Sequence, residues 1–286
     1  MPSDLLDPSF VKVKRGKTGV CNICLTPCDL QWDHVPPQGG IDVVPLEQYT
    51  ILERLAGRAD KPNRLLTQNG VKFQTLCRNC NTNILGGQYD RTLNDFACVV
   101  GQFLKNEHPL PSTAIFTTKP ARLLRSLFGH LLAAKAEVMH SKPDVAMRRF
   151  VLDPTAPLPQ ELNVFYWVYP HPQVHVARDI VMLSLYASLA GTPGIFSILK
   201  YFPVAYLVTN LTAYEGLPSL SGLFSPAIDA EVQITLPLTG LKPPDWPDDG
   251  NNIVAGGGIS QAQSSVSAFP KGVNIRPPIR YFSSRR

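Results

Sequence analysis

The chain has 286 residues, of which 44% are hydrophobic and 17% are charged, and its formal net charge is +5 at pH 7. This composition provides ample core-forming material for one large or two ordinary domains. The small positive excess is spread along the chain, so it permits a polyanionic partner without requiring one. The first residues lack the basic-then-apolar order of a signal peptide, which favours a reducing, cytoplasmic setting.

Residues 1–20 are polar and basic. One interpretation is a strand or arm that contacts phosphate groups on the way into the rest of the fold. The other is a solvated edge strand, because lysine side chains also protect sheet edges. Both interpretations stay open. The basic side chains concerned are Lys12, Lys14, Arg15 and Lys17.

Four of the six cysteines form two Cys-x-x-Cys pairs, Cys21 with Cys24 and Cys77 with Cys80. In a reducing compartment this spacing favours a metal over disulfides, and two such knuckles complete a tetrahedral four-sulfur zinc site. We therefore predict a structural Zn²⁺ ion. Cys28 is a spare ligand candidate, but four sulfurs already fill the site, so a free or buried thiol is the favoured interpretation.

The stretch from Leu30 to Val35 predicts a short strand, which ends at Pro36-Pro37 because proline blocks continuation of a ladder. Side chains alternate along a strand, so Asp33 and His34 point to opposite sides unless the strand end twists or bulges. A bulge at such a place can re-aim a side chain toward a metal.

Residues 38–70 separate the two cysteine pairs. Within them, Leu46 to Leu55 has the apolar spacing of a helix, flanked by glycine- and asparagine-containing loops. Val71 to Leu76 predicts the returning strand that delivers the second cysteine pair. After Asn81 we expect a polar, glycine-rich helix or turn, and a helix over Arg91 to Lys105.

The likeliest boundary lies near Pro109 to Ser112, and a second helix follows from Pro120, a favoured first-turn residue. Strands are then predicted, around a Pro-His-Pro turn and beyond it, at Asn163 to Tyr169, Val174 to Ala177, Ile195 to Leu199 and Val204 to Thr209.

Twenty residues from Ile180 to Leu199 carry no formal charge. Their length fits a membrane span, but Gly191 to Gly194 breaks the stretch, so two buried strands or a helix and a strand fit better and we expect no span. After Pro237 the chain is rich in proline, glycine and serine, which predicts an extended or disordered tail.

The predicted fold class is α+β, in three parts. Residues 1–110 form a zinc-bearing domain, residues 111–236 form a separate α+β domain for recognition, sensing or assembly, and residues 237–286 form an extended basic tail.

The two cysteine pairs, the Asp33-His34 dipeptide and the trailing Asn81 together resemble the zinc-stapled branch of the HNH (ββα-metal) endonucleases, over roughly residues 18–105. The resemblance implies an N-terminal ββα-metal domain in which His34 is the general base. It also implies that Asp33 and Asn81 bind a catalytic Mg²⁺ or Mn²⁺ ion. The residue types suit these roles, because imidazole titrates near neutral pH and hard oxygen ligands suit these cations.

One position departs from the family pattern. The family's middle Asn, which orients the base, lies about five residues before the second cysteine pair, and here Lys72 occupies that place. Either Gln74 or a loop residue such as Asn69 orients His34, or the site is weakened. Asp90, just beyond, could assist with metal or phosphate, or simply be solvated.

Two hypotheses follow. The first is an HNH endonuclease that cuts nucleic acid, with DNA favoured over RNA. By analogy with bacterial restriction and anti-phage effectors, it would be activated by a nucleotide messenger or a protein and would act as a homodimer. The second is a non-catalytic zinc-stapled module that binds nucleic acid or protein. The residues predicted to contact nucleic acid are Lys12, Lys14, Arg15, Lys17, Lys72 and Arg78.

Overall fold

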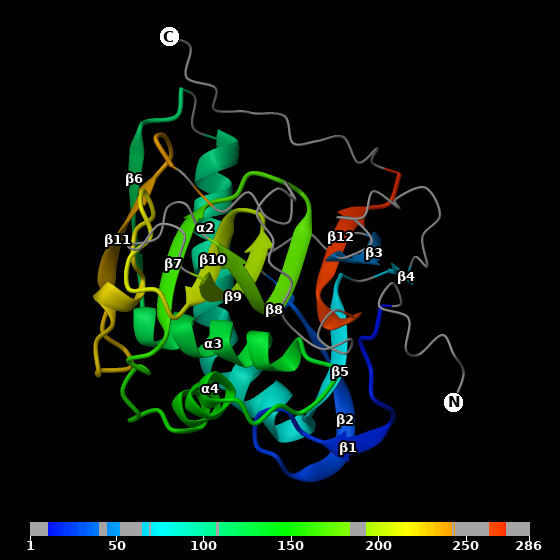
Figure 1. Ribbon diagram of the computed structural model, residues 1–286. Coiled ribbons are helices and arrows are strands. Elements are labelled where there is room, and N and C mark those ends of the chain that lie inside the picture. Colours follow the sequence, from blue (N-terminus) through cyan, green and yellow to red (C-terminus); the bar gives the residue numbers. More distant parts are fainter. Residues whose placement is uncertain are drawn as a thin grey trace.

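A computed structural model describes residues 11–39, 45–51, 65–68, 70–106, 109–183, 193–241, 243 and 263–272. These residues form a mixed α/β fold with three sheets whose strands pair antiparallel (Figure 1). The strands are β1 Thr18–Val20, β2 Pro27–His34, β3 Leu46–Thr50, β4 Leu65–Thr67, β5 Lys72–Cys77, β6 Thr113–Thr118, β7 Asn163–Val168, β8 Val174–Leu183, β9 Pro193–Tyr201, β10 Val204–Thr209, β11 Val232–Pro237 and β12 Val266–Pro270. The helices are the π-helix η2 Asn79–Tyr89, α2 Asp90–Asn106, α3 Pro120–Ala133, α4 Lys142–Leu152 and the short 3₁₀ turn η3 Ser221–Leu223.

The three-stranded sheet, called the small sheet below, has the order β1-β2-β5. Helices η2 and α2 follow β5 in the chain. The register of β2 against β5 shifts between Gln31 and Trp32. Residues three apart lie on opposite faces of a regular strand, yet Leu30 and Asp33 are both buried, because the bulge reverses the alternation. The register skips Thr75 of β5 at this point, and the Asp33 side chain beyond it is buried.

The large sheet has seven strands in the order β4-β3-β12-β8-β9-β10-β7. Its strands β7 and β10 are apolar runs without alternation, which is the pattern of a sheet buried on both faces. Along β7, Val164 and Tyr166 belong to the larger core whereas Phe165 and Trp167 belong to a second core on the opposite face. These strands, and those at β8 and β9, lie where the sequence predicted them.

Two predictions were wrong. The helical spacing from Leu46 to Leu55 begins with strand β3, and the part of that stretch beyond Ile51 lies outside the described residues. The tail after Pro237 includes β12, which pairs with β3 on one side and β8 on the other. Val266 and Ala268 are fully buried there, so this part of the tail is a central strand of the sheet rather than an extended or disordered segment.

Helix α3 joins the parts that the sequence divides near residue 110. It contacts α2, η2, β2 and β5 on one side and α4 and β8 on another. Figure 1 shows the small sheet at the lower right and the β6–β11 pair at the left, with α2 and α3 between them. The larger hydrophobic core contains residues from Val11 to Ala268. Residues from both sides of the predicted boundary thus contribute to this larger core.

A buried ionic cluster fixes the far end of α3. Lys135 binds Asp144 at 2.8 Å and also pairs with Asp179, while Arg178 binds Asp144 at 2.9 Å. Burial alone would raise the pKa of Asp144, but the charges of Arg178 and Lys135 outweigh it and lower the pKa to about 2. The cluster therefore ties α4 and β8 to the chain just beyond α3.

The uncharged stretch from Ile180 to Leu199 contributes to β8 and β9 in its described part. Among the helices that the structure describes, none has the length and apolarity needed to cross a membrane.

Candidate metal centre and the site beside it

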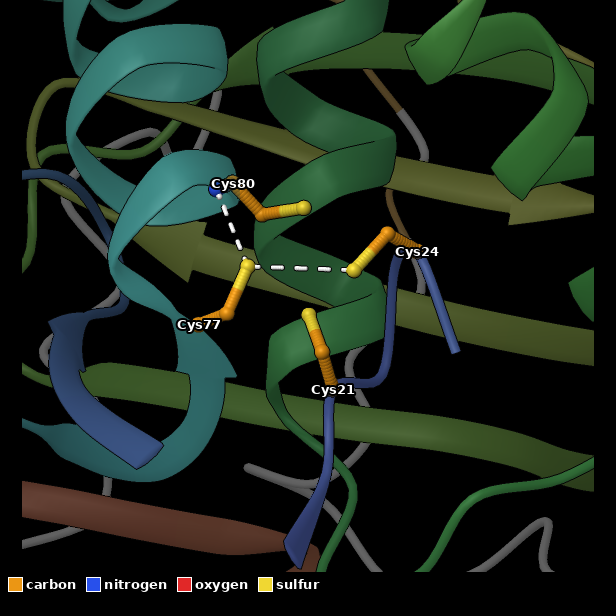
Figure 2. Close-up of side chains that lie close together, drawn as sticks. All are labelled: Cys21, Cys24, Cys77 and Cys80. Atoms are coloured by element: carbon orange, nitrogen blue, oxygen red, sulfur yellow. Dashed lines mark hydrogen bonds between the residues drawn. The ribbon is translucent and has the colours of Figure 1, made fainter. Parts of the chain in front are cut away.

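Four cysteines converge at the junction of β2, β5 and η2. Figure 2 shows their thiols turned toward one another, and the four sulfur atoms all lie within 4.8 Å of each other. The sulfurs of Cys24 and Cys77 are 3.7 Å apart. Tetrahedral Zn–S bonds of about 2.3 Å place sulfurs about 3.8 Å apart, so this edge already has the length of a four-sulfur zinc site. The four thiols could bind a metal such as zinc.

Backbone hydrogen bonds shape both knuckles. In the first, Leu25 N–H donates to Cys21 O and Cys21 N–H donates to Thr26 O, both at 3.0 Å. Leu25 takes a left-handed conformation with φ of 60°, which is uncommon for a side chain of this kind and closes the turn tightly. In the second, Cys80 N–H donates to the Cys77 sulfur at 3.3 Å. The local backbone therefore holds the sulfurs in place around a common centre.

The two remaining cysteines lie outside this group of four. Cys28 is half-buried in β2 and Cys98 is exposed on α2. The favoured interpretation of Cys28 as a free thiol agrees with the structure.

The first knuckle also docks onto α3. Asn22 is buried and donates its amide Nδ2–H groups to the backbone oxygens of Leu132 and Lys135, each at 2.8 Å. Thr75 in β5 donates its hydroxyl to Ala133 O at 2.7 Å. The last carbonyls of a helix have no partner within it, so these side chains satisfy the end of α3 and fasten it to the cysteine cluster.

Asp33, the predicted ligand of a catalytic metal, is 4% exposed and faces α3. Its Oδ2 lies 2.9 Å from Nδ1 of His130, and Nε2 of the same ring lies 2.9 Å from Oδ1 of Asp90. The hydroxyl of Ser126 donates to that Asp90 oxygen at 2.7 Å. One fully buried imidazole therefore bridges two carboxylates that come from β2 and from the start of α2.

The charge state of His130 follows from these contacts. Burial alone would lower the pKa of His130, but the charges of Asp33 and Asp90 and their hydrogen bonds to the ring outweigh it and raise the pKa to about 10. Each ring nitrogen faces a carboxylate oxygen, and the charged form of the ring carries a donor on both nitrogens.

The other predicted catalytic residues lie on adjoining elements. His34 ends β2 and stands opposite Lys72 in β5. Asn81, in η2, donates Nδ2–H to Trp32 O at 2.9 Å, which ties the helix to the strand just before Asp33 and His34. This bond uses the amide nitrogen of Asn81 and not its amide oxygen.

Of the two residues suggested to orient His34, the structure describes Gln74 alone. Gln74 donates its amide to Leu30 O at 3.0 Å and stands opposite Trp32 rather than His34 in the register. Asn69 lies outside the described residues.

The basic residues predicted to contact nucleic acid fall into three groups. Arg15 donates to Val20 O at 2.6 Å and to Thr75 O at 3.1 Å, and Lys12 lies 3.4 Å from a carboxylate oxygen of Glu137, so both have structural contacts. Lys72 is half-buried. The exposed members are Lys14, Lys17 and Arg78.

Reasoning from the sequence did not single out His130, which contacts both Asp33 and Asp90. Its neighbours on α3 provided a signal. Ser126 and His130 are four residues apart and so lie on one face of the helix, and both contact Asp90. Buried polar groups on a helix need hydrogen-bond partners.

Comparison with protein-family models, with curated proteins and with solved structures finds no match. The geometry alone defines the class. This is a mixed α/β protein with a four-cysteine cluster, able to hold a metal ion such as zinc, between an antiparallel strand pair and the helix that follows it.

Proposed function

We propose that the protein is a metal-dependent endonuclease of the HNH type, with a structural Zn²⁺ ion on its four cysteines. The observation that supports this is the position of the cluster between β2, β5 and η2. Asp33 and His34 end the strand that follows the first knuckle, Asn81 follows the second, and the bond from Asn81 to Trp32 O joins the two parts at 2.9 Å. The zinc would restrain both ends of the catalytic site.

The chemistry assigned to these residues is phosphodiester hydrolysis. His34 accepts a proton from the attacking water, since imidazole is a base near neutral pH. Asp33 and Asn81 offer a carboxylate and an amide oxygen, donors that fit Mg²⁺ or Mn²⁺. When bound, the ion supplies charge neutralisation at the phosphoryl group and help for the leaving oxygen.

DNA is the favoured substrate, with the exposed side chains of Lys14, Lys17 and Arg78 as backbone contacts. The biological setting that we propose, by analogy alone, is a cytoplasmic prokaryotic defence or restriction effector. It would be triggered by a nucleotide messenger or a protein activator, and it would cut both strands as a homodimer.

The second candidate is a non-catalytic zinc-stapled module that binds nucleic acid or protein. Two observations favour it. The Asp33 carboxylate is buried and engaged with His130, and Lys72 rather than an amide stands opposite His34.

Cleavage assays separate the two candidates. Plasmid and single-stranded nucleic acids are incubated with Mg²⁺ or Mn²⁺ and with wild type, His34→Ala or His140→Ala, where His140 is an exposed histidine outside the site. Zinc content is measured on all three proteins. Metal-dependent cutting by wild type and by the His140 variant, but not by His34→Ala at equal zinc content, supports the nuclease.

Cutting that survives in His34→Ala contradicts the assigned base. If zinc-loaded wild type does not cut, Lys72→Asn and added nucleotide messengers are tested next. An absence of cutting under all of these conditions favours the binding module.

A further inference from the structure

The trio of Asp33, His130 and Asp90 is the most heavily constrained polar group next to the proposed active site. Asp33 is 4% exposed and His130 is 0% exposed. A buried carboxylate is costly unless hydrogen-bond partners accompany it. His130 provides such a partner to Asp33 at 2.9 Å through Nδ1.

The rigid imidazole ring sets the relative position of three elements. Its two nitrogens point in different directions, toward Asp33 on β2 and toward Asp90 at the start of α2, and the ring itself belongs to α3. The orientation of the Asp33 carboxylate is therefore fixed from the side of α3. Oδ2 is held by the ring, so Oδ1 would be the oxygen offered to a metal ion.

Close packing prevents the ring from moving away. Gly129 precedes His130, and a β-carbon at Gly129 would lie only 2.2 Å from a methyl carbon of Leu85 in η2. The Leu85 side chain of η2 thus packs directly against the α3 backbone at Gly129. At the C-terminal end of the same helix, Asn22 and Thr75 bind the terminal carbonyls.

We propose that His130 is a positioning residue for the catalytic metal site: it holds Asp33 in the orientation that binds the divalent cation. The inference rests on the proposed function. Carboxylate ligands are usually hydrogen-bonded by an outer partner, and loss of that partner typically costs 10–100-fold in metal affinity, by order of magnitude.

Two conservative variants separate the two ends of the ring. The amide nitrogen of asparagine lies near the place of Nδ1, so His130→Asn keeps a donor for Asp33 and loses the bond to Asp90. The amide nitrogen of glutamine lies near the place of Nε2, so His130→Gln keeps a donor for Asp90 and loses the bond to Asp33. A merely structural role for His130 gives no reason for the two to differ in metal affinity at equal stability.

The test measures Mn²⁺ binding to the zinc-loaded full chain by calorimetry and by the loss of the free-ion electron paramagnetic resonance signal. Cleavage activity against Mn²⁺ concentration is recorded in parallel. We expect His130→Gln to weaken Mn²⁺ binding on the order of 10–100-fold, and His130→Asn to stay within a few-fold of wild type. Zinc content and thermal unfolding are measured on each variant, and Ser126→Ala is the control that removes a bond to Asp90 alone.

Several results overturn the proposal in distinguishable ways. Equal Mn²⁺ binding by wild type and His130→Gln contradicts the positioning role while leaving the nuclease intact. A wild type that neither binds Mn²⁺ nor cuts contradicts both the role and the proposed function. If His130→Gln does not load zinc, His130→Asn and Ser126→Ala decide the matter, because a large loss of Mn²⁺ affinity in either would place the requirement at Asp90 instead of Asp33.

Discussion

Replacing Gly129 by alanine should destabilise the protein, although alanine is the better helix former. The new β-carbon would lie 2.2 Å from Cδ2, 3.1 Å from Cδ1 and 3.2 Å from Cγ of Leu85. Carbon atoms in contact normally lie about 3.5–4.0 Å apart. The Leu85 side chain, which is fully buried, or one of the two helices must therefore move by more than about 1 Å.

The expected change in the free energy of unfolding is the difference between a gain in helix propensity and a cost of overpacking. Alanine in place of glycine inside a helix gains about 1 kcal/mol of propensity. Overpacking of a well-filled core typically costs about 1–3 kcal/mol, and the size of this overlap favours the upper end. The free energy of unfolding should fall by about 2 kcal/mol, which corresponds to a lower melting midpoint by roughly 4 °C for a chain of this length.

The assay measures thermal and urea unfolding of three variants, which are Gly129→Ala, Leu85→Ala and the double variant. Leu85→Ala alone should cost about 2–5 kcal/mol through the cavity that it leaves. In that background the methyl group has room, so Gly129→Ala should be neutral or stabilising by about 1 kcal/mol. A single Gly129→Ala variant as stable as wild type, or more stable, would refute the close packing of α3 on η2.

Three further predictions concern the parts that α3 connects. The Cys80→Ala variant should not retain zinc, and the region around the cluster should unfold, whereas the control Cys98→Ala should retain zinc. Metal analysis and circular dichroism measure the two effects. Equal zinc content in both variants would contradict the four-cysteine site. Asn22→Ala should lower the free energy of unfolding by about 2 kcal/mol, because two buried carbonyls lose their donor, and an unchanged urea midpoint would count against it. The pKa of Asp144 is lowered from 3.8 to about 2, since Arg178 and a neighbouring lysine outweigh the effect of burial. Its contribution of about 2 kcal/mol is therefore complete above about pH 4 and is lost as the pH falls toward 2, so Asp144→Asn should show a shallower loss of stability over that range than wild type.

Local signals predicted the N-terminal half of the site well. Cysteine spacing and a proline stop are properties of a few neighbouring residues, and they located the two knuckles and the strand that ends at His34. The helix from Pro120 likewise followed from one proline and a run of apolar residues. Where the structure depends on contacts between residues close in sequence, the pattern was enough.

Strand β12 shows why other parts could not be read in the same way. Five residues, Val266–Pro270, lie within a long stretch rich in glycine, serine and proline, so an average over that stretch hides them. Their place is decided by pairing with β3 and β8, which lie far away in sequence. The same long-range pairing overrides the helical spacing that begins at Leu46, because a short apolar run is compatible with either structure.

The buried imidazole belongs to the same category, and it connects the fold to the proposed chemistry. Near His130 in the sequence, Ser126 one turn earlier is the signal of a polar contact, because both carboxylate partners of the ring lie in other elements. His130 can contact both Asp33 and Asp90 because α3 is held between the cysteine cluster and the large sheet. A helix that lies beyond the predicted domain boundary thus contacts the carboxylate that the sequence assigned to the metal. For this reason the proposed active site depends on the fold as a whole and not on residues 1–110 alone.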